Sequence, residues 1–167
     1  MQKIANGMKG SPPSVDPTLL QSELEATRQA FHALIESLPA DRWRQPSPSS
    51  AWTIGEVLVH LTWAIEYLPQ EVEQARHGKG MFNMPKWLAA PLSYWYVRWL
   101  ARNADPDALR RRYDDAMDAT LRTLDTIGGE EWMRGANFYG EGFHSVADLF
   151  HSAAKHFAEH TAGWPQR

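Results

Sequence analysis

The sequence predicts an all-α protein: a four-helix bundle with long connections and an extra aromatic-rich helical insert. Four segments repeat apolar residues at steps of three and four, which is the spacing of one face of an α-helix. Two of these segments begin with Asp-Pro, an N-cap followed by proline at the first helical position. No segment of useful length alternates apolar and polar residues as a half-buried strand does.

The chain has 167 residues, a length that suits one domain. Residues 1–15 hold glycine and proline among small and polar side chains, so we expect a flexible N-terminal tail and a bundle domain over residues 16–167. The first helix is predicted to begin at the Asp16-Pro17 cap and to end near Pro39.

The second helix is predicted to begin behind Thr53. Thr53 and Glu56 fit a capping box, in which each side chain accepts a hydrogen bond from the other residue's backbone N–H. Trp52, directly before the cap, is expected to belong to the hydrophobic staple. Pro69 is expected to kink this helix, which runs to about Arg76.

An aromatic insert follows at residues 81–104 and holds three of the eight tryptophans. It is apolar on more than one face, which predicts a broken helix that covers an active site, a dimer surface or both. Its most apolar stretch, residues 87–97, contains Pro91 and is much shorter than the roughly 20 apolar residues of a membrane span. We therefore expect no membrane insertion.

A second Asp-Pro pair, Asp105-Pro106, predicts the start of the third bundle helix, which Gly128 and Gly129 close. A glycine-rich loop separates this helix from the last one, which is predicted to begin at Ser145.

Composition excludes several kinds of site. The chain contains no cysteine, which rules out a disulfide scaffold, an iron–sulfur cluster, a thiolate zinc site and a cysteine nucleophile. Its net charge of -3 gives no electrostatic footprint for nucleic acid. The N-terminus has no apolar core of signal-peptide length, so we expect a cytoplasmic protein. Any tightly bound transition metal must then be held by imidazole or carboxylate groups.

Three of the seven histidines are predicted to face the interior. His156 and His160 are four residues apart, so they project from one face of the last helix within about 40° of each other. The buried ring nitrogens of this pair need polar partners. Either a shared metal ion or separate hydrogen bonds to neighbouring groups would supply them. His60 lies on or beside the apolar stripe of the second helix. It is either a metal ligand or a single buried histidine with a structural role.

The remaining histidines have no clear place in such a site. His151 is about 140° around the last helix from the first histidine of the pair and is expected to face solvent or another helix. His144 directly precedes the predicted N-cap of the last helix, and His32 and His77 have no other histidine near them in the sequence. Glu66 is about 240° around the second helix from its histidine, which puts it off the site.

Two blocks of the sequence resemble the DinB-like, YfiT-like superfamily of helical bundles. Residues 52–61 (WTIGEVLVHL) match its tryptophan, cap and "EVLxHL" pattern, and residues 145–160 match its capped helix with HxxxH. The resemblance spans about residues 17–164. The aromatic insert is longer and richer in tryptophan than the family pattern suggests.

The resemblance implies that His60, His156 and His160 bind a divalent metal ion, because they occupy the positions of the family's ligands. Family members include S-transferases that use bacillithiol or mycothiol, a mycothiol-dependent maleylpyruvate isomerase, and metal-dependent hydrolases. Three histidines leave coordination positions open for water or substrate.

We therefore expect a divalent-metal-dependent enzyme that acts on a small molecule, as a thiol S-transferase or a hydrolase. Zinc, nickel, iron and manganese are all candidates, as is a low-molecular-weight thiol cosubstrate. One alternative is a non-catalytic small-molecule-binding or dimeric bundle with a structural metal, and another is a bundle without metal. We expect a homodimer. The sequence identifies no general acid or base; His144, Tyr139 and Glu141 are candidates by position only.

Overall fold

The computed structural model describes residues 15–80, 86–137 and 142–164. Its α-helices are α1 (Pro17–Ser37), α2 (Ile54–Arg76), α3 (Lys86–Ala101), α4 (Pro106–Leu124) and α5 (Val146–Thr161). The predicted all-α class is confirmed. The expected N-terminal tail lies outside the described residues, except for Val15.

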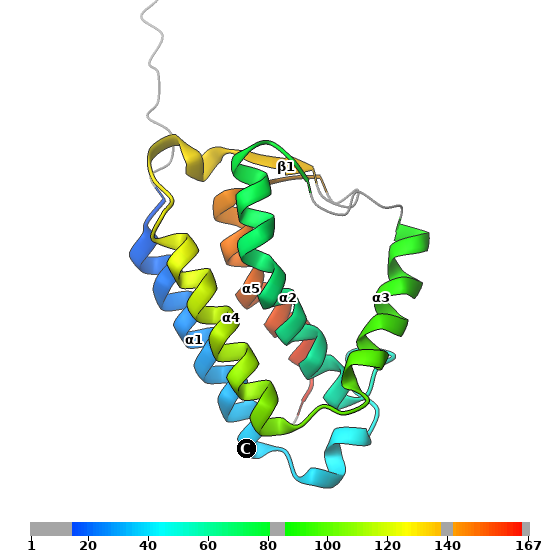
Figure 1. Cartoon of the computed structure of the whole chain (residues 1–167). Coiled ribbons are helices and arrows are strands. Elements are labelled where there is room, and N and C mark those ends of the chain that lie inside the picture. The colour runs from blue at the N-terminus through cyan, green and yellow to red at the C-terminus, as the bar shows by residue number, and fades with distance from the viewer. Residues whose placement is uncertain (1–14, 81–85, 138–141, 165–167) are drawn as a thin grey trace, which may run out of the picture.

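Four of the helices form the bundle, and each packs on two neighbours. α1 packs on α4 and α5, and α2 packs on the same two helices, so the order around the bundle is α1, α4, α2, α5. Figure 1 shows α1 and α5 running in one direction and α2 and α4 in the other. Because α2 and α4 are parallel, the chain between them must return along the length of the bundle.

α3 makes this return and stands apart from the bundle at its N-terminal end (Figure 1). It is one continuous helix, so the predicted break in the aromatic insert is wrong for the described residues. Pro91 removes a backbone hydrogen bond to the carbonyl four residues earlier. Pro91 is exposed, which lets water reach the freed carbonyl, and the helix continues. α2 likewise continues through Pro69.

The loop before α5 contains a small antiparallel sheet that the sequence did not predict, β1 (Gly135–Asn137) with β2 (Phe143–Ser145). Three-residue strands are too short to produce a detectable alternation of apolar and polar side chains. Gly135 permits the pairing, since a Cβ atom there would lie 2.1 Å from the carbonyl oxygen of His144.

The third bundle helix ends four residues before the predicted glycine stop, at Leu124. Ile127 belongs to the loop but is still buried, which explains why it continued the apolar pattern.

The core lies between the four bundle helices and is mostly aliphatic. At its centre the rings of Phe31 on α1 and Tyr113 on α4 stack with centroids 3.7 Å apart. None of the helices in the described part of the chain is long and apolar enough to cross a membrane.

Candidate metal centre

Two capping boxes fix the starts of the helices that carry the candidate ligands. At α2 the backbone N–H of Thr53 donates to Glu56 at 2.8 Å, and the N–H of Glu56 donates to the Thr53 hydroxyl. At α5 the backbone N–H of Ser145 donates to Asp148 at 2.9 Å, and the N–H of Asp148 donates back to Ser145. The hydrogen bonds from Ser145 lower the pKa of the Asp148 carboxyl. Both predicted helix starts are confirmed.

The antiparallel packing of α2 and α5 brings the three predicted histidines together. His60 lies in the second turn of α2, and His156 and His160 lie in the last turns of α5. Their ring centroids are 4.7 to 4.9 Å apart, and one nitrogen from each ring lies within 4.8 Å of the others. These three residues are called the histidine cluster below.

Burial disfavours the charged form of two members of the histidine cluster, His60 and His160. The pKa of His60 is lowered from 6.5 to about 3, first by burial and then by repulsion from the two neighbouring imidazoles. Burial also lowers the pKa of His160. Neutral imidazoles have a free lone pair, which is the form that binds a metal ion.

The donor set fits a divalent metal ion. His60 Nε2 and His156 Nε2 lie 3.0 Å apart, close to the spacing of about 3.4 Å that bonds of about 2.1 Å give in a tetrahedral site. The Nδ1 atoms of His60 and His160 are buried and make no hydrogen bond to a described residue. With Nε2 as the ligand atom, Nδ1 of His60 would carry the ring proton and need an acceptor of its own. No carboxylate joins the cluster among the described residues, so the ligands would be neutral.

Trp52 covers the histidine cluster, a role that sequence reasoning missed. Its ring centroid lies 4.6 Å from that of His60 and 6.1 Å from that of His160. It also stacks on Tyr94 of α3, with ring centroids 6.3 Å apart. The loop that presents Trp52 is attached to α5, because the Ser49 hydroxyl donates to the backbone carbonyl of His160. Trp52 therefore links the histidines to α3 in addition to preceding the cap.

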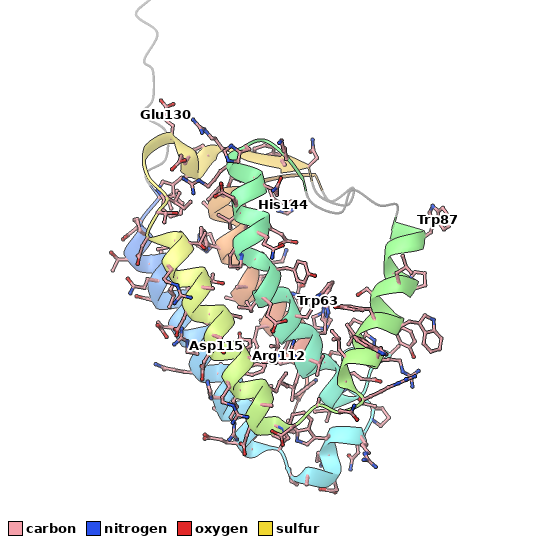
Figure 2. The ribbon with its side chains drawn as sticks, in the orientation of Figure 1. Trp63, Trp87, Arg112, Asp115, Glu130 and His144 are labelled. Carbon is pink, nitrogen blue, oxygen red and sulfur yellow. The ribbon has the colours of Figure 1, made fainter. Side chains whose placement is uncertain are left out.

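A cavity of about 200 Å³ opens beside the cluster and is called the α2–α5 cavity below. One face of α2 lines it from His60 to Glu71, together with Tyr113 of α4 and the part of α5 from Ser152 to Phe157. Trp63 forms part of its wall and points from α2 toward the side where α3 lies (Figure 2). The ring of Trp63 contacts that of Tyr96 on α3, with centroids 5.6 Å apart.

The other histidines are partnered away from the cluster. His151 is exposed and pairs with Glu23 of α1, as its angle on the helix predicted. His32 pairs with Asp114 at 2.7 Å and His77 with Glu73 at 3.0 Å, partners that the sequence did not reveal.

The positional candidates for acid–base chemistry do not reach the cluster in the described structure. His144 lies in β2, near the C-terminal end of α2, whereas the cluster lies near the start of that helix (Figure 2). Tyr139 and Glu141 lie outside the described residues. Glu66 pairs with Arg112 at 2.8 Å, which confirms that it is off the site.

Comparison with known proteins gives a family and two partial relatives. The model of a family described as the DinB superfamily matches residues 23–162, which is most of the chain. Two uncharacterised proteins of Mycobacterium tuberculosis, from two strains, are each 42% identical to this chain over 48 residues. That stretch is 29% of this chain and 19% of each relative, so the match spans about a fifth of the relatives' length.

The lowered pKa of His60 predicts that acid destabilises the chelator-treated protein. Above pH 6.5 the residue is neutral in both the folded and unfolded states. As the pH falls below 6.5, His60 becomes protonated in the unfolded state but stays neutral in the folded state until about pH 3. His60 should therefore lower the free energy of unfolding by up to about 2 kcal/mol between about pH 7 and 5.

Urea unfolding of wild type and His60→Gln at both pH values measures this effect. The glutamine variant should lose less stability on acidification, whereas His77→Gln, at the exposed C-cap of the same helix, should follow the wild type. Equal pH slopes for His60→Gln and wild type would contradict the prediction.

Proposed function

The chain belongs to the DinB superfamily, and we propose that it is a divalent-metal-dependent enzyme that acts on a small molecule, as a thiol S-transferase or a hydrolase. The observation that carries the proposal is the convergence of three imidazoles at the edge of a cavity. His60, His156 and His160 are the proposed ligands. Zinc, nickel, iron and manganese are the candidate ions, since ligand affinity alone does not choose among them.

When bound, such an ion would supply a positive charge that stabilises a water-derived or thiol-derived nucleophile near neutral pH. Neutral ligands support this role because they leave that charge uncompensated. Burial keeps His60 unprotonated and ready to bind. Trp52 shields one side of the cluster, and the α2–α5 cavity leaves the other side accessible to a substrate.

The open side of the cluster favours an enzyme over a bundle with a structural metal. Structural sites are closed by protein ligands, whereas catalytic sites keep a position for water or substrate. The described residues supply three ligands and no fourth, and His60 and His156 both line the α2–α5 cavity.

The thiol route requires a cosubstrate, because the chain contains no cysteine. Bacillithiol, mycothiol and glutathione are the thiols to test. A cytoplasmic location, where such thiols are kept reduced, is part of this proposal.

Metal content tests the proposed ligands directly. Protein purified without a histidine tag should retain about one divalent ion per chain, and His60→Ala or His156→Ala should retain less than about a tenth of that. His151→Ala should retain as much as wild type, because that imidazole pairs with Glu23 instead. Elemental analysis by mass spectrometry measures the retained metal. Equal loss in all three variants would show that the ligands are misassigned.

Activity separates the two reaction classes. Metal-loaded protein is incubated with one model electrophile and each thiol, and separately with ester and amide substrates. A thiol S-transferase should consume thiol and electrophile together, and a hydrolase should act without any thiol. In either class His156→Ala should lower the rate by at least about a hundredfold, whereas His151→Ala should not. Bound metal without activity in either assay would favour the non-catalytic alternative.

We also propose that two copies of the chain associate through α3. Three of its tryptophans are mostly exposed: Trp87 at 76%, Trp95 at 65% and Trp99 at 60%. Large exposed apolar patches are rare on monomers and are typical of interfaces.

Light scattering after size exclusion tests this association. The wild type should elute at about 38 kDa, twice the 19.0 kDa of one chain. Trp95→Glu combined with Trp99→Glu should give the monomer mass. Leu19→Glu, on an exposed position of α1, should leave the dimer intact. A monomeric wild type would contradict the proposal.

A further inference from the structure

Glu71 lines the same cavity as His60, at its far end along α2. The two residues are eleven positions apart on α2, which corresponds to about 20° around the helix and about 16 Å along it. They therefore share one face of α2, and Trp63, Ala64 and Tyr67 lie between them on that face.

Glu71 differs from Glu66 and Glu73 of α2 because it has no ion-pair or hydrogen-bond partner among the described residues. Glu66 pairs with Arg112 at 2.8 Å, and Glu73 pairs with Arg76 at 3.0 Å. For Glu71, burial raises the pKa of the carboxyl, and no positive charge or hydrogen bond from a described residue opposes this effect. A half-buried carboxyl of this kind is costly to ionise unless a bound cation compensates it.

Aromatic side chains line the cavity between the histidine cluster and Glu71, and Tyr67 lies one turn before Glu71 on α2. Trp63, Tyr67, Tyr113 and Phe157 all line the cavity, and the rings of Trp63 and Tyr67 meet edge to face with centroids 5.2 Å apart. Aromatic faces attract ammonium groups through their negative quadrupole, most strongly where water is excluded. A carboxylate among aromatic walls is therefore complementary to an organic cation.

We propose that the α2–α5 cavity binds a small molecule that carries an ammonium group, with that group at Glu71. The rest of the molecule extends along the α2 face toward the histidine cluster. Placing the reacting group at His60 and His156 rests on the proposed function. Recognition of the cation by Glu71 and the aromatic walls does not, because it needs no metal ion.

Because recognition of the cation needs no metal ion, binding is measured on metal-free protein. Calorimetric titration uses the full chain treated with chelator, and two probes of the same shape, phenethylamine and phenethyl alcohol. At about pH 8 the amine is protonated and the alcohol is neutral. The wild type should bind the ammonium probe at least about ten times more tightly than the alcohol.

Glu71→Gln tests the carboxyl with a nearly isosteric side chain that is not charged. It should bring the two dissociation constants within about twofold of each other, whereas Glu73→Gln, on the exposed side of the same helix, should keep the wild-type preference. Tyr67→Leu, one turn before Glu71 on α2, should weaken the preference several-fold while leaving the carboxyl in place. Circular dichroism confirms that each variant is folded.

Two results would overturn the proposal: a wild type that binds both probes equally, or a Glu71→Gln variant that keeps the full preference. Failure of the proposed function is recognised separately. If the protein binds no metal but still prefers the ammonium probe, the metal-dependent activity fails and the cation site stands. If metal-dependent activity is found without a preference for the ammonium probe, the proposed function stands and the cation site fails.

Discussion

The antiparallel packing of α2 against α5 is the constraint on which the site depends. It places the second turn of α2 beside the last turns of α5, so His60 meets His156 and His160 although 96 residues separate the first two in the chain. Capping boxes at both helix starts fix where each helix begins, and this sets the angle at which every later side chain projects. A one-residue shift of either start would turn its histidines by about 100°, away from the others.

The same topology explains the aromatic helix. α2 and α4 are parallel neighbours, so the connection between them spans the bundle, and α3 is the rigid part of that connection (Figure 1). Its C-terminal half is held to α2 by the ion pair of Arg98 with Glu56 at 3.1 Å and by the ring contact of Tyr96 with Trp63. Tyr94 contacts Trp52 in the loop before α2. Through Trp52 and Trp63, these contacts couple the position of α3 to the surroundings of His60.

Sequence reasoning predicted the parts of the site that depend on helical period. The spacing of His156 and His160 fixes their common face whatever surrounds them, and the capping boxes are local patterns. Trp52 and Glu71 could not be predicted in the same way. The contacts of Trp52 depend on how a loop folds back on α5. Glu71 looks like any glutamate of α2 until the structure shows which of them find a basic partner. The continuity of α3 through Pro91 likewise depends on solvent access at that position.

The polarity of the α2–α5 cavity follows from the rigidity of α2. One helix face carries His60 at one end and Glu71 about 16 Å further along, with apolar and aromatic side chains between them. A cation bound at the histidine cluster would repel a second positive charge nearby, whereas the carboxyl of Glu71 attracts one at the far end. Screening by water is weak in a partly enclosed apolar space, so this difference acts over the length of the cavity. A bound molecule with one ammonium group therefore has one favoured direction, set by Glu71 of α2 at one end and by the histidines of α2 and α5 at the other.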